Sequence, residues 1–222
     1  MNISNLKHLS FSNLNLFETC PRCWYLKYVL GYEMPGSDAM DFGSEVHRAI
    51  ENYHKTGALP VVKKDGTGGY LRAMIQAYTD VFKKEDYDTI EEFWEVPIEH
   101  PEQKGVFLDL PLVVRIDRVW NGVIRDVKTS ASRYQQSRVD GAYQTTLYAY
   151  AYRQKFQKEE NGIAYDVLVK NKVPKLQILD TFATDESIKD ALWWIWNTFE
   201  TIKNYPEPSN HSKRCWNKGL LP

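Results

Sequence analysis

The chain has 222 residues, of which 43% are hydrophobic and 26% are charged. These proportions exclude an intrinsically disordered chain and predict one compact domain with a sizeable apolar core. The formal net charge of −1 excludes nucleic-acid binding through the field of the whole protein, so such a role must depend on local basic patches or on metal ions.

Cysteine content and apolar runs bear on the cellular compartment. Three cysteines, an odd number, argue against a disulfide framework and favour a reducing compartment. The longest apolar runs are far shorter than the ~18 residues of a membrane span, and the opening MNISNLKHLS lacks the charged start and apolar stretch of a signal peptide. We therefore expect a cytoplasmic protein with no membrane partner.

Apolar periodicity predicts that the first third of the chain is helical. Two short helices joined at Cys20-Pro21 are expected within residues 9–31, because proline is suited to a first helical position. Residues 41–57 predict a helix that ends at Gly57, and residues 70–86 predict a further amphipathic helix.

From Glu91 the pattern changes to alternating and β-branched residues, which predict strands. The expected strands cover residues 93–100, 105–120, 123–129, 162–170 and 175–182, and the expected helices cover residues 139–156 and 184–204. This order of elements indicates an α/β fold with a mixed central sheet flanked by helices.

Asn121-Gly122 lies between two strand-like runs and predicts a type I′ hairpin turn. With a two-residue turn, the paired residues are those whose numbers sum to 243. Asp117 then faces Asp126 with Cβ atoms ~5 Å apart, and Arg118 faces Arg125 on the other side of the sheet.

Two carboxylates held this close repel each other unless a positive group lies between them. A divalent metal such as Mg²⁺ or Mn²⁺ meets this need, because hard cations prefer oxygen ligands. Lys128 projects to the same face as Asp126 and could stabilise a phosphorane-like transition state or orient the attacking water there. The alternative is that both aspartates lie on an exposed sheet face, as most strand carboxylates do.

Two helical pairs add candidate residues. Gly43 lies one turn before His47, so a small residue would allow another backbone or a nucleic acid to approach closely. Gln144 and Tyr148, four residues apart, share one helical face. Taken alone, His47 fits a half-buried structural histidine better than a functional one.

The segments GSEVH, VRID, RDVKT and QTTLY, in this order, resemble the RecB-type branch of the PD-(D/E)XK nuclease superfamily. That branch includes phage and bacterial recombination exonucleases and CRISPR-adaptation nucleases. The resemblance runs from LSFSNLNLFETCPRCWYLKY to the helix that ends near Arg153. It implies a restriction-endonuclease-like core in a single nuclease domain, 1–222, in which residues 1–90 are mainly helical, residues 91–205 form a sheet-and-helix catalytic core and residues 206–222 form a C-terminal tail.

The resemblance also implies roles for individual residues in metal-assisted phosphodiester hydrolysis. Lys128 corresponds to the catalytic lysine, and Gln144 and Tyr148 to a pair that contacts DNA or supports that lysine. The metal ligands correspond to His47, Asp117, Asp126 and the backbone carbonyl of Val127. The chain departs from the family pattern at Val114, where glycine is frequent, and at Arg125, which occupies the proline position of the motif.

Iron–sulfur members of the family bind their cluster with four cysteines. This chain offers Cys20, Cys23 and Cys215, so a cluster would need His211 or an external ligand as its fourth. The sequence therefore favours an enzyme without an iron–sulfur cluster.

Local basic patches could contact DNA phosphates. Arg133 and Arg138 follow the hairpin, further cations lie within residues 170–175 and 213–218, and Tyr134 and Tyr143 could stack on unpaired bases. The alternative for each cation is a solvated loop charge, and Tyr143 is equally suited to the core.

The resemblance implies a Mg²⁺- or Mn²⁺-dependent DNA exonuclease that acts on DNA ends or single-stranded regions in recombination, repair or end processing. It would act in the cytoplasm of a bacterial or phage-infected cell, and a recombination or annealing protein is a candidate partner. The alternatives are a CRISPR-adaptation-type nuclease or endonuclease of the same family, and a non-catalytic DNA-binding module on the same fold.

Overall fold

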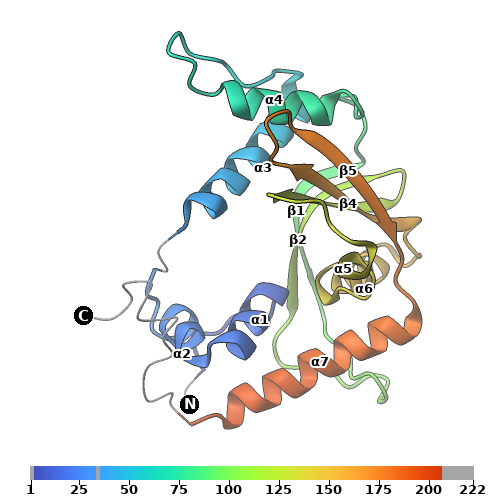
Figure 1. The fold of residues 1–222 in the computed structure, drawn as a ribbon. Helices are drawn as coiled ribbons and strands as arrows, with labels where there is room; N and C mark the ends of the chain where they lie inside the picture. Colours follow the sequence, from blue (N-terminus) through green and yellow to red (C-terminus); the bar gives the residue numbers. More distant parts are fainter. Residues whose placement is uncertain (1–2, 34–35, 207–222) are drawn as a thin grey trace. The chain divides into compact units, whose positions relative to one another are not determined.

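A computed structural model describes residues 3–33 and 36–206 (Figure 1). The helices are α1 (Phe11–Thr19), α2 (Pro21–Trp24), the π-helical turn η1 (Tyr25–Val29), α3 (Asp38–Thr56), α4 (Gly69–Thr79), α5 (Gln136–Val139), α6 (Tyr143–Phe156) and α7 (Asp185–Asn204). The strands β1 (Thr89–Val96), β2 (Leu112–Trp120), β3 (Val123–Ser130), β4 (Gly162–Val169) and β5 (Lys175–Thr181) form one sheet in the order β1-β2-β3-β4-β5. The predicted α/β fold with a mixed, helix-flanked sheet is confirmed.

The chain divides into two compact units. The terminal unit takes the described residues of Met1–Gly36, Trp94–Val114 and Thr184–Pro222, and the sheet unit takes Ser37–Phe93 and Arg115–Ala183. The expectation of a single nuclease domain stays a prediction. Among the described residues, no helix combines the length and apolarity needed to cross a bilayer.

In the terminal unit, helices α1 and α7 begin at capped positions. Ser10 and Thr184 each accept a hydrogen bond from the backbone N–H three residues on, as N-cap residues do. The two helices contact each other, and Trp194 donates its indole N–H to Glu18 at 2.6 Å. Helix α1 ends at Thr19 and α2 begins at Pro21, and α7 begins after Thr184. The predicted break at Cys20-Pro21 and the predicted helix start at residue 184 are confirmed.

The hairpin between β2 and β3 follows the predicted register. Asn121 and Gly122 both have positive φ, 50° and 73°, as a type I′ turn requires. The backbone pairs run from Trp120–Val123 to Arg118–Arg125, so each pair of residue numbers sums to 243 as predicted.

Strand β3 also pairs with β4, in parallel, and β4 pairs with β5 in antiparallel orientation. The sheet unit is therefore mixed at β3, which has an antiparallel neighbour on one side and a parallel neighbour on the other. Its eight residues pair with β4 along the whole strand, and this pairing fixes β3 in place.

Two apolar clusters lie on opposite faces of the sheet, because neighbouring residues of β4 point to opposite sides. Leu168 packs with helices α3 and α4, whereas Val167 and Val169 pack with Val139 of α5. Helix α6 contacts β3 as well. Strand β3 is consequently covered by helices, which makes it a rigid base for side chains.

A buried ion-pair triad holds the face of the hairpin that packs against α4. Asp166 of β4 accepts hydrogen bonds from Arg118 at 3.0 Å and from the Arg125 Nε at 2.8 Å, and all three side chains are buried. From the sequence alone, two arginines facing each other across the hairpin argue for an exposed face, because like charges repel. In the structure, Asp166 offsets the charge of both arginines inside the protein. The arginine at the motif's proline position is therefore a structural residue.

Several elements differ from the predictions; for example, β1 covers Thr89–Val96 rather than residues 93–100. Helix α4 ends at Thr79 rather than near residue 86, because Lys83 and Asp86 form a turn in which the Asp86 carboxylate accepts the Lys83 N–H at 2.8 Å. Residues 105–111 contribute only the isolated Glu99–Phe107 bridge, since Gly105 has a φ of 80° and Pro111 has no N–H. Helix α5 was not predicted, because four residues are too few for a periodic signal.

Candidate functional site

Helix α3 brings His47 to the sheet. Ser37 caps the helix, and buried Val46 and Ile50 attach it to the core that includes Val127 of β3. A Cβ atom at Gly43 would lie 3.6 Å from the Thr129 hydroxyl oxygen. Gly43 therefore packs against β3 at ordinary contact distance, one turn before His47.

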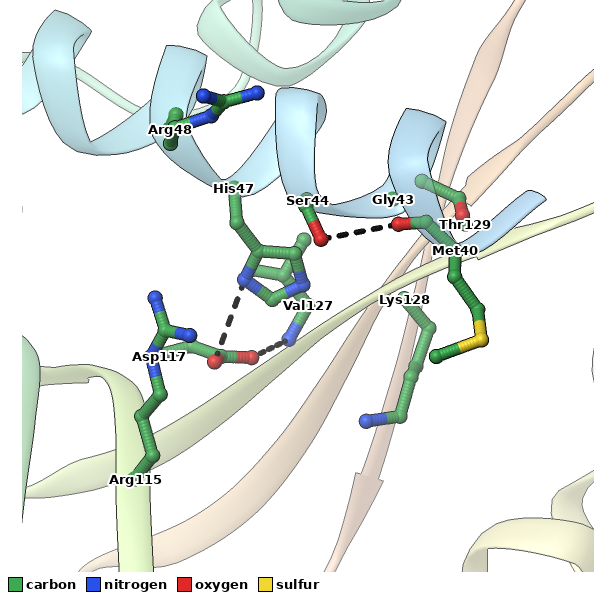
Figure 2. A pocket seen from close by; sticks show the side chains of 10 residues that line it. All are labelled: Met40, Gly43, Ser44, His47, Arg48, Arg115, Asp117, Val127, Lys128 and Thr129. Carbon is green, nitrogen blue, oxygen red and sulfur yellow. Dashed lines mark hydrogen bonds and ion pairs between the residues drawn. The ribbon is translucent and has the colours of Figure 1, made fainter. Parts of the chain in front are cut away.

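Asp117 joins the two hairpin strands through its side chain. One step beyond the last backbone pair, Arg118–Arg125, its Oδ2 accepts the Val127 N–H at 2.7 Å. Its other oxygen, Oδ1, lies 3.4 Å from the Nδ1 of His47. Figure 2 shows both interactions.

Glu91 of β1 is a site residue that the sequence analysis missed. Its Oε1 lies 3.2 Å from His47 Nδ1, and its Oε2 accepts a hydrogen bond from Arg115 Nε at 2.8 Å. The residue has a φ of 51°, which is uncommon outside glycine and is a feature that clusters at functional sites. The alternation of polar and apolar residues could not predict the role of Glu91, because its backbone departs from regular strand geometry.

His47, Glu91 and Asp117 each offer one ligand atom, and these atoms lie within 4.8 Å of one another. Burial lowers the pKa of His47, but hydrogen bonding to Asp117 and Glu91 and their charges outweigh burial and raise it to about 10. The imidazole between two carboxylates marks a place of strong negative potential. One imidazole nitrogen and two carboxylate oxygens are donors that fit a divalent cation.

Lys128 and Asp126 form a close ion pair beside this group. The lysine Nζ lies 2.9 Å from Asp126 Oδ1 and 2.7 Å from Oδ2. Burial, together with the charge of Asp117, raises the pKa of Asp126 to about 6, although Lys128 opposes this shift. Burial lowers the pKa of Lys128, but both aspartates outweigh burial and raise it above its usual value, so the amine is a cation at neutral pH.

Helix α6 supplies the predicted Gln144–Tyr148 pair. The Gln144 amide donates to the Tyr148 hydroxyl at 2.7 Å. Burial and the charges of Asp126 and Asp117 hold the pKa of Tyr148 well above its usual value. The phenol therefore keeps its proton and lies within electrostatic reach of the two aspartates.

Three of these side chains line an open pocket of about 660 Å³ (Figure 2). They are His47, Asp117 and Lys128, and Gly43 and Val127 also line the pocket. Its remaining lining residues include two arginines, Arg48 and Arg115. The pocket combines a negative group of ligands with cations, which suits a phosphate ester held against a metal ion.

The other predicted contact residues lie outside the lining of this pocket. Arg133 is exposed, and the guanidinium of Arg138 stacks on Tyr134, 3.8 Å from the ring centroid. Tyr143 is exposed at the start of α6. A role for these residues in DNA binding stays a prediction.

The two N-terminal cysteines are buried in the terminal unit. Cys20 Sγ accepts the Cys23 N–H at 3.2 Å, and both side chains are 3% exposed. Cys215, His211 and the basic residues 213–218 lie outside the described residues. The structure does not test the expected absence of an iron–sulfur cluster.

Comparison with known proteins identifies the family. The PD-(D/E)XK nuclease superfamily model matches residues 8–217. The fold is similar to that of a candidate exonuclease from Eubacterium rectale, with a TM-score of 0.65, 15% sequence identity, and coverage of 99% of this chain and 91% of that one. It is also similar to SSO0001, with a TM-score of 0.50, 12% identity, and coverage of 100% and 89%. No curated protein matches the chain.

At these identities the solved structures show similarity of fold alone. The family model, in contrast, spans most of the sequence and includes His47, Asp117, Asp126 and Lys128. The chain belongs to the PD-(D/E)XK nuclease superfamily.

Proposed function

We propose that this protein is a Mg²⁺- or Mn²⁺-dependent DNA exonuclease of the RecB type, acting in recombination, repair or DNA end processing. The observation that carries the proposal is the convergence of His47, Asp117 and Lys128 on one pocket. Buried Asp126 lies directly beside the lysine. A divalent-cation site next to a fixed ammonium group is the arrangement that phosphodiester hydrolysis needs.

In this proposal, His47, Asp117, Asp126 and the Val127 carbonyl hold the divalent cation. The bound cation supplies a Lewis acid that lowers the pKa of water and offsets charge on the scissile phosphate. The Val127 N–H holds the Asp117 carboxylate through Oδ2, so that its Oδ1 is turned toward His47. The Asp117 carboxylate is therefore oriented by the sheet itself.

Lys128 acts on the phosphate in this scheme. Asp126 fixes the Lys128 amine at the pocket. The raised pKa of Lys128 keeps the positive charge that stabilises a developing oxyanion. Arg48 and Arg115 line the same pocket and can contact neighbouring phosphates. Gln144 and Tyr148 support the lysine or contact DNA from α6.

The resemblance of the motif segments to recombination exonucleases supports exonucleolytic rather than endonucleolytic cleavage. An endonuclease or CRISPR-adaptation-type nuclease is the alternative within the family. A non-catalytic DNA-binding module is the alternative of another class, and the intact Asp117, Asp126 and Lys128 argue against it. We place the enzyme in the cytoplasm of a bacterial or phage-infected cell, with DNA as its substrate and a recombination protein as its candidate partner.

The test is cleavage of end-labelled linear, circular and single-stranded DNA in Mg²⁺ or Mn²⁺. We expect cleavage from DNA ends, and we expect Lys128→Ala to lower the cleavage rate by roughly 10²–10³-fold, as loss of one transition-state contact does. Lys55→Ala is the matched control, because Lys55 is exposed on α3 and pairs locally with Glu51.

The outcomes separate the alternatives. Absence of metal-dependent cleavage for every substrate would reject the enzyme and leave the DNA-binding module. Cleavage of circular DNA would reject the exonuclease in favour of an endonuclease.

A further inference from the structure

Arg115 connects the pocket with an aromatic side chain of β1. It lines the pocket together with Asp117 and Lys128 (Figure 2). Its Cζ also lies 5.7 Å from the centroid of the Phe93 ring, which is within the range of a cation–π contact. Phe93 therefore stands at the rim of the pocket, one side chain beyond Arg115.

The ring of Phe93 faces solvent. Phe93 is 69% exposed, whereas the next residue on the strand, Trp94, is 1% exposed, as neighbouring strand residues point to opposite sides. A single exposed phenylalanine is ordinary on a protein surface. Phe93 differs from such a residue because it contacts an arginine that lines the candidate active site. A ligand in the pocket can therefore extend onto the ring.

Arg115 is fixed on one side and open on the other. Its Nε and Nη2 lie 2.8 and 2.7 Å from Oε2 of Glu91, and 54% of its side chain stays exposed. The guanidinium thus keeps its place beside the ring and can still meet a phosphate. Proteins bind single strands of nucleic acid with this combination, because cations follow the backbone and aromatic rings stack on bases.

The charges of β1 determine which part of a nucleotide Phe93 can take. Glu92 precedes Phe93 and is partly exposed, and Glu95 follows two residues later and is exposed. Their carboxylates repel a phosphate, whereas a base is uncharged and offers an apolar face. Inside a duplex that face is covered by the neighbouring base pairs, so the ring can reach only a base that has left the stack.

We propose that Phe93 stacks on an unpaired base next to the phosphate in the pocket, and that the site takes DNA as a single strand. Arg115 contacts the backbone of the same segment. This inference rests on the proposed nuclease function and names its substrate class. Phe93 holds the strand and touches no reacting atom. Because every base has such a face, binding through Phe93 should tolerate any sequence.

The test measures binding of the full chain to a fluorescently labelled single strand in Mg²⁺ by anisotropy. All proteins carry Lys128→Ala, so that cleavage is slow. Adding Phe93→Ala should raise the Kd by roughly 5–150-fold, the range for loss of one base–aromatic stack. For a strand of the same length built from abasic nucleotides, Phe93→Ala should leave the Kd unchanged, because no base is left to stack.

Three comparisons sharpen the assignment. Phe93→Trp should keep the affinity of the natural strand, because indole also stacks on bases. Phe182→Ala is the matched control, because Phe182 is 73% exposed but lies outside the lining of the pocket, and it should bind like the parent. Arg115→Ala should weaken binding of natural and abasic strands alike, because a phosphate contact does not need the base. Circular dichroism should show that each variant folds.

A single abasic nucleotide, moved along the natural strand, locates the stacked base. At one position it should lower the affinity of the parent to that of Phe93→Ala, and Phe93→Ala should add no further loss there. Failure to find such a position would overturn the proposal.

Equal losses for natural and abasic strands in Phe93→Ala, or no loss for either, would also overturn it. Tighter binding of a blunt duplex than of the single strand would reject the substrate class. These failures are separate from failure of the proposed function. Metal-dependent cleavage at an unchanged rate in Phe93→Ala would reject only the stacking role, whereas Phe93-dependent binding without cleavage by wild type would reject only the nuclease.

Discussion

At the scale of the residue, Asp166 balances the charge of two buried arginines. Asp166→Asn should lower the free energy of unfolding by about 3–5 kcal/mol, because it leaves Arg118 and Arg125 buried without their counter-charge. Urea unfolding followed by fluorescence measures this change. Glu51→Gln, which removes an exposed partner of Lys55, should change the free energy by about 0.5 kcal/mol or less. Equal losses in the two variants would contradict the importance of burial.

The site residues show how far sequence reasoning reaches at this scale. Motif order and spacing led to His47, Asp117 and Lys128, and the structure brings these three to one pocket. Glu91 could not be found in this way, because its orientation depends on a positive φ and on Arg115 of another strand. The role of Asp166 was also hidden, since its arginine partners lie 48 and 41 residues away in the chain.

At the scale of the element, the hairpin turn is fixed by a neighbouring segment as well as by its own residues. Asn161 donates its side-chain amide to the Asn121 carbonyl at 2.7 Å and its backbone N–H to the Gly122 carbonyl at 2.9 Å. A Cβ atom at Gly122 would lie 2.8 Å from the Asn161 amide nitrogen. Gly122→Ala therefore combines backbone strain with a steric conflict against an anchored side chain.

We expect Gly122→Ala to destabilise the protein by more than the roughly 1–2 kcal/mol cost of the left-handed conformation alone. Gly141→Ala is the matched control, because Gly141 has a φ of 70° but nothing within 4 Å of the added Cβ. The difference between the two unfolding midpoints measures the contact with Asn161. Equal midpoints would show that this contact has no effect.

The elements were predictable where periodicity or turn chemistry was strong. Asn121-Gly122 predicted the hairpin register, and the apolar stripes predicted α3, α6 and α7. The end of α4 was not predictable from periodicity, because Phe82 continues the apolar stripe and is buried although it lies beyond the helix. Phe82 is packed against the guanidinium of Arg118, whose Cζ lies 4.0 Å from the Phe82 ring centroid. This contact buries the Phe82 ring although the residue is not part of the helix.

At the scale of the whole molecule, buried His54 should make stability sensitive to acid. Its Nδ1 donates to the Lys84 carbonyl at 2.8 Å, and its Nε2 accepts from the Tyr78 hydroxyl at 2.9 Å. Burial, aided by the charge of Arg118, lowers the pKa of His54. The neutral ring therefore contributes stability above pH about 6.5, and this contribution is lost as the pH falls below that value.

The measurement compares urea unfolding at pH 7.5 and pH 5.5. We expect wild type to lose more stability over this interval than His54→Gln, which carries no titrating group at that position. His8→Gln serves as the control, because His8 is exposed, and it should follow wild type. A His54→Gln curve parallel to wild type would show that this histidine does not contribute to acid sensitivity.

Under the proposed nuclease function, the hydrogen bond from the Val127 N–H to Asp117 decides which variant is best suited to trap a complex with uncut DNA. Asp117 serves the sheet and the metal donors at once, so Asp117→Ala would disturb β3 as well as any ion. Lys128→Ala removes the ammonium group but keeps this hydrogen bond and the carboxylates. It is therefore the better variant for crystallising the protein with an intact substrate, and β2 and β3 in that complex should superimpose on the present hairpin.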